Sequence, residues 1–389
     1  MARRAAIIVL DGLGIGPAHD TAAYGDTGSD TLGNTLRAVG GLCLPNLARL
    51  GLGCCAPLEG VPPESNPSAA WGTAQPASPG KDSITGHWEI CGVVLEQPFP
   101  TYAAGFPPEL VAEFARRTGR GVLGNKVASG TGILEELGAE HQGSGSWIIY
   151  TSADSVFQVA AHEGTVPLEE LYAACRIARE LLRGEHGVSR VIARPFGGRA
   201  GSWRRTANRR DFSLPPPGST LLDLLAGAGL PRVGIGKVDD LFAGRSLSSI
   251  HTETNAQAYR LIEDALATMD RGLLFVNVIE FDQTWGHRND VPGFTGGLED
   301  LDRAIPGLLR GTQENDLIIF TADHGNDPTT PSTDHSRERV PILVYGPRVR
   351  ARPLGERSTF ADIGQTVAEF LGVGPLAAGT SFLGEVCGA

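Results

Sequence analysis

Residues 80–92 read GKDSITGHWEICG and crowd polar side chains between two glycines. Ser83 and Thr85 each carry a hydroxyl that could act as a nucleophile. An alcohol attacks at neutral pH only when a base or a metal ion activates it. The segment therefore predicts a nucleophile at Ser83 or Thr85 whose activating groups come from elsewhere in the chain.

Three apolar segments are each followed by acidic residues, in the sequences 7-IIVLDGLG-14, 273-LLFVNVIEFDQTWGH-287 and 317-LIIFTADHGND-327. A further Asp-His pair stands at 334–335. In a parallel sheet, ligands bind beyond the carboxyl ends of the strands, so these side chains are expected at one edge. They supply three carboxylates and three imidazoles: Asp11, Asp282, Asp323, His287, His324 and His335.

Three carboxylates at one edge would repel one another unless a cation or protons neutralise them. Mixed Asp and His ligands suit Mn²⁺ or Zn²⁺ better than Ca²⁺. Six such side chains and one hydroxyl are enough to hold two metal ions, which could promote an in-line phosphoryl displacement. Taken singly, an Asp after a strand is usually a turn former or helix cap, and a His at such a place is usually structural. The joint pattern favours a dinuclear centre.

The composition is that of a globular protein without a strongly basic surface. The chain has 389 residues, is 41% hydrophobic and 20% charged, and carries a net charge of −11. This charge argues against nucleic-acid binding. The apolar run at 5–10 is too short for a signal peptide or a membrane span. The six cysteines show no C-x-x-C spacing, so reduced thiols in a cytoplasmic setting are expected. No membrane association and no obligatory protein partner are expected.

Segments rich in Val and Ile alternate with helical patterns. Buried parallel strands are predicted at residues 5–10, 233–235, 273–279, 317–321 and 340–345, and helices at 256–269 and 298–309. This alternation predicts an α/β fold, with helices on both faces of a parallel-rich central sheet.

The middle of the chain follows another pattern, with helices predicted at 109–117 and 168–182 and strands at 146–152 and 188–196. Proline-rich segments at 98–108 and 214–220 flank it. We expect a core formed by residues 1–96 and 217–389, and an inserted α+β domain formed by residues 97–216.

The sequence resembles the bacterial phosphopentomutases of the alkaline phosphatase superfamily. The similarity runs nearly end to end and includes VLDGLGIG, GKDSITGHWEICG, YTSADSVFQVAAHE, FDQTWGHRND and TADHGNDPTTPSTDHSRERVPILVYGP. It implies an alkaline-phosphatase-like catalytic core with a cap domain inserted after the nucleophile segment. It also implies that Ser83, directly after Lys81-Asp82, is phosphorylated, while Thr85 supports the turn. Most relatives carry threonine where this chain has Ser83. The serine is therefore expected to affect the rate of phosphoryl transfer more than the type of reaction.

The resemblance also assigns the ligands. One metal ion would be held by Asp11, Asp323, His324 and the Ser83 oxygen, and the other by Asp282, His287 and His335. Two Mn²⁺ ions are implied, with other divalent metals possible, and a sugar bisphosphate would prime the enzyme. Substrate contacts are implied for Ser152, Asp154, Arg194, Arg205 and Arg209, with Lys237 as a further phosphate contact. A solvated basic surface is the alternative for the arginines.

The implied reaction interconverts ribose 1-phosphate and ribose 5-phosphate, and the 2-deoxyribose analogues, through phosphoserine and a bisphosphate. The rivals on the same core are a phosphatase, a cofactor-independent phosphoglycerate mutase, and a mutase for a modified pentose phosphate in secondary metabolism. A metal-binding protein without catalytic activity is the rival from another class, but all six predicted side-chain ligands and a hydroxyl at position 83 are present.

Overall fold

The protein is described by a computed structural model that covers residues 2–152 and 155–387, and it divides into two compact units. Unit 1 comprises Met1–Pro98 and Pro216–Ala389, and unit 2 comprises Phe99–Pro215. Each crossing between the units falls in a proline-rich segment. Each unit has its own sheet and its own buried side chains.

Unit 1 is built on an eight-stranded sheet with the strand order β10-β9-β11-β1-β12-β13-β2-β14. The central strands β11, β1 and β12 are buried along their whole length, which explains why they appear in the sequence as continuous apolar runs. The strands are β1 (Arg4–Leu10), β2 (Ala70–Ala74), β9 (Arg232–Ile235), β10 (Ser249–Ile250), β11 (Gly272–Val278), β12 (Asp316–Thr321), β13 (Val340–Tyr345) and β14 (Pro353–Arg357).

The expected parallel orientation is wrong for residues 340–345. Strand β13 pairs antiparallel with both β12 and β2, whereas the other pairings in this sheet are parallel. A parallel return needs a crossover, usually a helix, but residues 322–339 contain none. The chain instead turns back beside β12, and the connecting loop stays at the edge where β12 ends.

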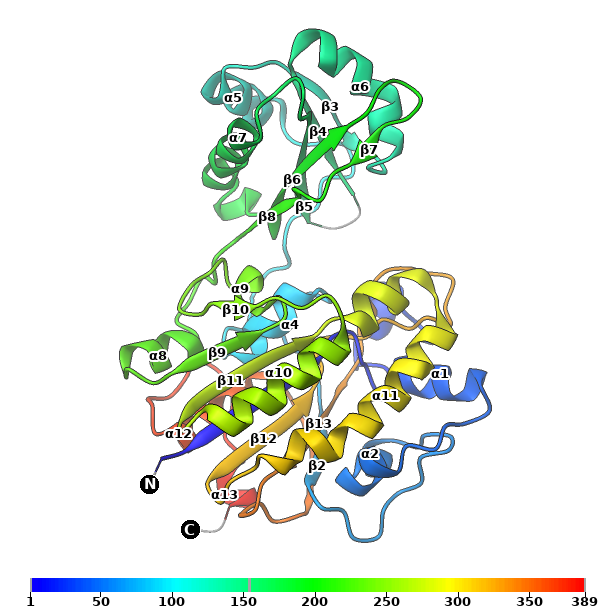
Figure 1. The fold of residues 1–389 in the computed structure, drawn as a ribbon, viewed down its shortest axis with the longest axis vertical. Helices are drawn as coiled ribbons and strands as arrows, with labels where there is room; N and C mark the ends of the chain where they lie inside the picture. Colours follow the sequence, from blue (N-terminus) through cyan, green and yellow to red (C-terminus); the bar gives the residue numbers. More distant parts are fainter. Residues whose placement is uncertain (1, 153–154, 388–389) are drawn as a thin grey trace. The chain divides into compact units, whose positions relative to one another are not determined.

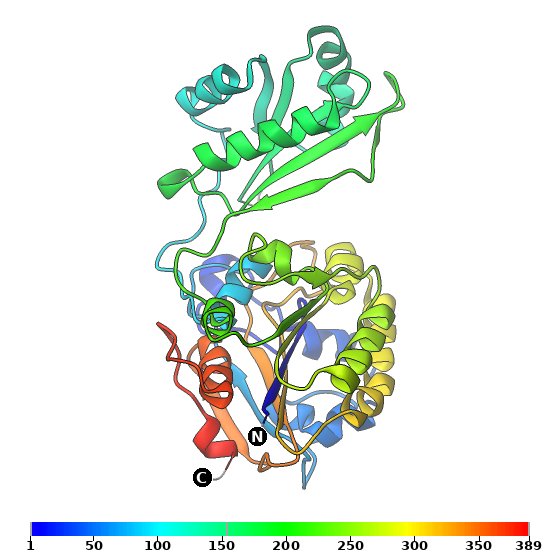
Figure 2. The same ribbon diagram turned by 60° about the vertical axis from the view of Figure 1, so that its left-hand side comes forward.

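Helices cover both faces of this sheet (Figure 1). Helices α10 (Asn255–Thr268) and α11 (Val291–Arg310) lie on one face, and α4 (Ser83–Ile90), α8 (Leu221–Gly227) and α12 (Ala361–Leu371) lie on the other. Figure 2 shows the two helical layers on opposite sides of the sheet. The other α-helices described in this unit are α1 (Thr31–Ala38), α2 (Pro45–Leu50), α3 (Leu52–Cys55), α9 (Val238–Leu241) and α13 (Leu383–Val386).

Helix α11 begins seven residues before the predicted start at 298. Asp290 caps it by accepting a hydrogen bond from the backbone N–H of Gly293, and Pro292 lies in the first turn, where a missing N–H costs little. The helix also continues through Pro306, which cannot bond to the carbonyl of Asp302. Asn46 donates its side-chain amide to that carbonyl at 3.0 Å, so the freed acceptor is satisfied.

Unit 2 has a mixed sheet with the order β3-β4-β5-β6-β7, and β8 pairs with β6. Alternate residues of its strands face two apolar clusters, one under α5 and α7 and the other under α6. The strands are β3 (Val122–Val127), β4 (Trp147–Thr151), β5 (Val156–His162), β6 (Arg190–Gly197), β7 (Arg204–Arg205) and β8 (Arg210–Ser213), and the helices are α5 (Pro108–Thr118), α6 (Gly132–Ser144) and α7 (Leu168–Leu181).

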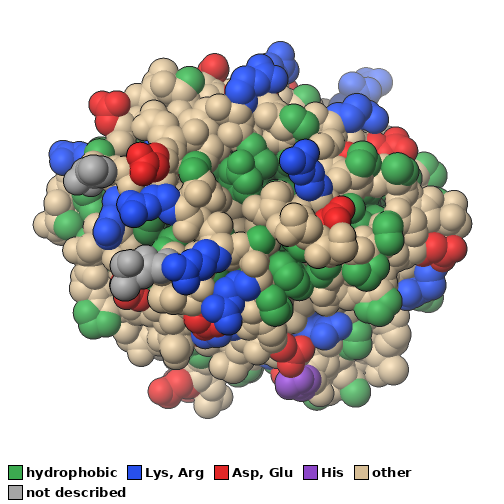
Figure 3. All heavy atoms as spheres, turned by 90° about the horizontal axis from the view of Figure 1, so that it is seen from below, with side chains coloured by type: hydrophobic (Ala, Val, Ile, Leu, Met, Phe, Trp, Pro, Cys, Tyr) green, Lys and Arg blue, Asp and Glu red, His purple; other side chains and the backbone are tan. Residues whose placement is uncertain are grey.

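Among the described residues, no helix combines the length and the apolar character needed to cross a membrane. All six cysteines carry free thiols. The face of the molecule in Figure 3 carries both Lys or Arg and Asp or Glu side chains, as expected of a solvated surface with charges of both signs.

Candidate active site

The three carboxylates predicted to share an edge follow three neighbouring strands. Asp11 directly follows β1, Asp323 lies two residues after β12, and Asp282 lies in a π-helical turn (Phe281–Trp285) after β11. Strand β1 lies between β11 and β12, and the register pairs Leu10 with Val278. All three carboxylates are buried and lie at the same end of the sheet.

Three potential ligand atoms lie around the Nε2 atom of His324. Its Nε2 atom lies 3.3 Å from Asp11 Oδ1, 3.4 Å from Asp323 Oδ2 and 3.0 Å from Ser83 Oγ. Its Nδ1 atom hydrogen-bonds to the Gly325 carbonyl at 3.0 Å, which leaves Nε2 without a proton in the neutral ring. A nitrogen lone pair, two carboxylates and a hydroxyl therefore face one small volume.

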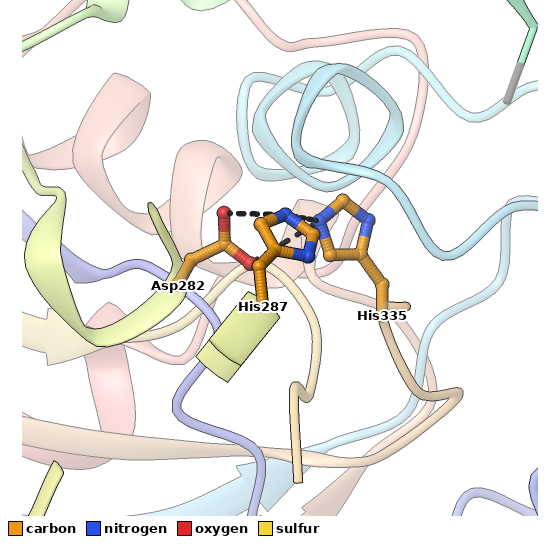
Figure 4. A group of neighbouring side chains, drawn as sticks. All are labelled: Asp282, His287 and His335. Carbon is orange, nitrogen blue, oxygen red and sulfur yellow. Dashed lines mark hydrogen bonds and ion pairs between the residues drawn. The ribbon is translucent and has the colours of Figure 1, made fainter. Parts of the chain in front are cut away.

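A second group consists of Asp282, His287 and His335, which converge from two separate loops (Figure 4). His335 Nε2 is 3.2 Å from Asp282 Oδ1, and His287 Nε2 is 3.3 Å from Asp282 Oδ2. The two imidazole Nε2 atoms are 3.2 Å apart. His287 donates its Nδ1 proton to the Thr333 carbonyl at 2.7 Å, so the neutral ring points a lone pair at His335.

Both groups fit a divalent cation. In the first, Asp323 Oδ2 is buried, and its nearest nitrogens among the described residues are His87 Nδ1 at 3.1 Å and His324 Nε2 at 3.4 Å. In the second, two imidazole Nε2 atoms and a carboxylate face one another, an arrangement that a proton or a metal ion between them stabilises. Ligand atoms about 2.1 Å from a tetrahedral ion stand about 3.4 Å apart, close to the spacings above. The groups adjoin, because the His324 and His335 ring centroids are 4.0 Å apart.

The pKa values of the buried carboxyl and imidazole groups are shifted because these charged groups lie close together. Burial raises the pKa of Asp11, and the charges of Asp323 and Asp282 raise it further. Burial also acts to raise the pKa of Asp282, but the charge of His335 and hydrogen bonds from both histidines hold it well below its usual range. Burial lowers the pKa of His287, yet its hydrogen bond to Asp282 raises it to about 9. Such strongly coupled shifts are typical of a functional site.

The two candidate hydroxyls are in different environments. Ser83 is the first residue of α4, and its Oγ lies 3.4 Å from Asp11 Oδ1 as well as 3.0 Å from His324 Nε2. Thr85 is buried, and its hydroxyl donates to Asp82 Oδ2 at 2.6 Å. The other Asp82 oxygen accepts from the backbone N–H groups of Ile84 and Thr85, which makes Asp82 the cap of α4. The structure thus places Ser83 with the ligands and Thr85 in the cap.

Two glycines allow the segments to approach closely. Gly12 has φ +77°, and a Cβ there would lie 3.2 Å from the Cβ atoms of Asp282 and Asn326. A Cβ on Gly86 would come within 2.2 Å of the Asp323 carbonyl oxygen. These positions exclude larger residues, so α4 and the loop after β1 can pack directly on the ligand loops.

Three of the predicted substrate-binding arginines of unit 2 lie close enough to Tyr150 for their charges to act on its hydroxyl. Arg194, Arg205 and Arg209 all act on the pKa of Tyr150 by lowering it, although burial is the largest effect and raises it. Burial and the charge of Arg209 lower the pKa of Arg194 to about 10. Arg209 is also paired with Asp211 through two hydrogen bonds of 2.8 and 2.7 Å. A cluster of like charges in this setting is suited to an anion.

Two of the remaining predicted contacts lie within the described residues, one in each unit. Ser152 follows β4 in unit 2, and Asp154 lies outside the described residues. Lys237 belongs to unit 1, where it donates to the side-chain oxygen of Gln283, the neighbour of Asp282. Lys237 is thereby held close to the second ligand group.

Sequence reasoning missed three buried polar residues that support the ligands. Asn326 donates to Asp282 Oδ1 at 2.7 Å, Asn277 donates to Asp11 Oδ2 at 3.0 Å, and His87 Nδ1 lies 3.1 Å from Asp323 Oδ2. Each is 0% exposed. A polar residue within the apolar run of β11 was the available signal for Asn277, because buried polar groups need partners.

Comparison with known proteins agrees with a metal centre. Residues 224–375 match the metalloenzyme superfamily. The chain is 53% identical over 386 residues to a phosphopentomutase of Dictyoglomus thermophilum, covering 99% of this chain and 98% of the relative. It is 56% identical over 388 residues to a phosphopentomutase of Anaeromyxobacter sp. strain K, covering 99% and 100%.

Proposed function

The chain belongs to the phosphopentomutase family, and on this basis we propose that Ser83 carries the phosphoryl group exchanged between the 1- and 5-oxygens of a pentose phosphate. The activity is that of an intramolecular phosphotransferase. The proposed substrates are ribose 1-phosphate and ribose 5-phosphate, together with the 2-deoxyribose analogues. The observation that carries the proposal is the position of Ser83 Oγ, 3.0 Å from His324 Nε2 and 3.4 Å from Asp11 Oδ1.

The proposed centre holds two Mn²⁺ ions. Asp11, Asp323, His324 and Ser83 would bind one, and Asp282, His287 and His335 would bind the other. When bound, the ions would neutralise the transferring phosphoryl group and lower the pKa of the Ser83 alcohol. Mixed carboxylate and imidazole ligands support Mn²⁺, and the buried Asp323 Oδ2, 3.4 Å from His324 Nε2, supports an ion in the first group.

The proposed cycle starts from phospho-Ser83. A free hydroxyl of the pentose monophosphate attacks the phosphorus, the bond from phosphorus to Ser83 Oγ breaks, and the hydroxyl proton passes to Ser83. The bisphosphate then turns round and returns its other phosphoryl group to Ser83, which loses the proton to the released sugar oxygen. Ser83 is the first residue of α4, so the helix N-terminus favours the added negative charge.

We assign unit 2 the role of a cap that binds the second phosphate. Arg194, Arg205 and Arg209 would hold the phosphate that is not reacting, with Ser152, Asp154 and Lys237 as further contacts. Guanidinium groups contact phosphate bidentately, which supports this role. The cap must also exclude water, because phospho-Ser83 would otherwise be hydrolysed. A cytoplasmic setting is proposed with it, since free thiols persist under reducing conditions.

Phosphorus NMR tests the reaction. The protein is incubated with Mn²⁺, a catalytic amount of a sugar bisphosphate, and ribose 5-phosphate, and ribose 1-phosphate is expected to appear. Free phosphate as the main product would instead indicate a phosphatase. Turnover of a modified pentose phosphate in preference to ribose would indicate the specialised mutase.

Intact mass tests the nucleophile. Priming is expected to add one phosphoryl group to the unsubstituted protein and to Thr85→Ala, but none to Ser83→Ala. Thr85→Ala is the matched control, because this hydroxyl lies in the same helix yet bonds to the cap residue Asp82. A phosphoryl adduct on Ser83→Ala would show that another residue is the nucleophile.

A further inference from the structure

His87 lies one helical turn after Ser83 in α4 and is completely buried. Both of its ring nitrogens contact groups of the candidate site. Its Nδ1 atom lies 2.9 Å from the Ser83 carbonyl oxygen and 3.1 Å from Asp323 Oδ2. Its Nε2 atom lies 3.3 Å from the side-chain nitrogen of Asn277. His87 thus connects the backbone of the proposed nucleophile to residues around the first ligand group, although it is not itself placed to bind the ion.

The hydrogen bonds fix which nitrogen of His87 carries the proton. A carbonyl oxygen only accepts, so Nδ1 must donate to Ser83. Asn277 also donates to Asp11 Oδ2 at 3.0 Å, so its amide group is turned with the NH₂ toward Asp11 and His87. The second N–H of Asn277 can then be accepted by His87 Nε2. The chain of contacts runs from the Asp11 carboxylate through Asn277 and His87 to the Ser83 carbonyl.

The surroundings of the ring leave it little freedom to rotate. Phe275 of β11 packs against it with ring centroids 5.7 Å apart, and Gly86 lets α4 approach the end of β12. Asp323 Oδ2 lies 3.1 Å from His87 Nδ1, while Asp323 Oδ1 accepts from the Gly12 N–H at 3.1 Å. The ring therefore contacts the carboxylate oxygen that would face the ion.

We propose that His87 and Asn277 are positioning residues that hold the carboxylates of Asp11 and Asp323 at a fixed separation from Ser83. This role rests on the proposed metal-dependent function. A nucleophile and its metal ion must be held together to within a fraction of an ångström for efficient transfer. The link through His87 supplies that constraint, because it joins two ligand residues and residue 83 through one immobile ring. Partners of this kind orient the ligands of a metal ion and tune its affinity.

Two substitutions of His87 each keep the contacts of one ring nitrogen and remove those of the other. His87→Asn can keep a donor close to the position of Nδ1, whereas His87→Gln extends its amide toward the position of Nε2. His141 in unit 2 gives a matched control, since it is also fully buried in a helix, with Nδ1 bonded to the Ser146 carbonyl and Nε2 accepting from the His162 N–H. The variant His141→Asn therefore reports the general cost of replacing a buried histidine.

The measurements are Mn²⁺ affinity by titration calorimetry, using the metal alone, and kcat and KM for ribose 5-phosphate. His87→Gln is expected to weaken Mn²⁺ binding and to lower kcat, each by about 10- to 100-fold, with KM nearly unchanged. His87→Asn loses the contact with Asn277 instead, so it is also expected to weaken Mn²⁺ binding and to lower kcat, because the chain of contacts to Asp11 needs both ring nitrogens. His141→Asn is expected to leave Mn²⁺ affinity as it is.

Unchanged Mn²⁺ affinity and kcat in both His87 variants would overturn the positioning role while leaving the proposed reaction intact. Failure of the unsubstituted protein to bind Mn²⁺ would overturn the metal centre itself, and the positioning role with it. Should His87→Gln not fold, Asn277→Ser carries the same test, because it leaves the ring in place and removes the donor to Asp11. The expected result is again weaker Mn²⁺ binding, and unaltered binding would refute the link.

Discussion

Glu338 offers the sharpest test of how the ligand loop is held. Its carboxyl is only 1% exposed, and burial raises its pKa from 4.5 to about 7. One oxygen accepts from the backbone N–H groups of Thr31 and Gly16 at 2.9 and 3.3 Å. The other accepts from the hydroxyls of Thr31 and Ser336, both at 2.7 Å. Ser336 directly follows the proposed ligand His335, so Glu338 ties this loop to α1.

The direction of the pH effect follows from the raised pKa. Between pH 4.5 and 7 the folded protein holds a proton on Glu338 that the unfolded chain has released, so stability falls as pH rises through this window. A shift from 4.5 to about 7 corresponds to about 3 kcal/mol of stability present at pH 4 and lost by pH 8. Glu338→Gln removes this dependence, and the Thr31 and Ser336 hydroxyls can rotate to accept from the new amide.

The assay is thermal unfolding of the unsubstituted protein and of Glu338→Gln at pH 5 and pH 8, with equal Mn²⁺. The difference in Tm between the two proteins is expected to move by about 5 °C in favour of the variant on going to pH 8, since about 2.5 kcal/mol is lost between these pH values and about 1 kcal/mol shifts Tm by about 2 °C in a unit of this size. Comparing differences cancels the titration of every other group.

Asp223→Asn provides the control. Burial acts to raise the pKa of Asp223, but hydrogen bonds from Thr220 and Ser246 hold it below its usual range. Its charged partner is Arg245, and arginine does not titrate between pH 5 and pH 8. Asp223 is therefore ionised at both pH values, and its variant is expected to give a constant difference in Tm. The same constant difference for Glu338→Gln would refute the claim that Glu338 is protonated in the folded protein below neutral pH.

Three further outcomes are expected. Arg4→Met leaves the buried Asp316 without its ion-pair partner and should destabilise the protein by about 3–5 kcal/mol, measured as a lower Tm. Chelating Mn²⁺ held at 100 times its Kd should remove about 2.7 kcal/mol of stability, and Asp282→Asn should reduce that loss. Arg194→Ala should raise KM for ribose 5-phosphate at least tenfold without altering Mn²⁺ affinity in calorimetry, because Arg194 belongs to the arginine cluster of unit 2.

The sequence by itself determined the strand-end carboxylates and the layers that present them. Continuous apolar runs predict buried parallel strands, and the central three occur as predicted. Because parallel strands end at one edge, the sequence alone places Asp11, Asp282 and Asp323 at a common end of the sheet. This prediction depends only on local sequence, because hydrophobic periodicity and the residue that follows a strand involve positions that are close together in the chain.

Only the tertiary structure decided which polar residues meet across long separations in the chain. Nothing local indicates that Asn277 lies between Asp11 and His87, or that Asn46 satisfies the carbonyl left free by Pro306. The reversed direction of β13 was likewise outside the reach of the apolar pattern, because a buried strand shows the same run of residues in either orientation. Such contacts depend on how distant segments pack against one another, and local sequence patterns do not reveal that packing.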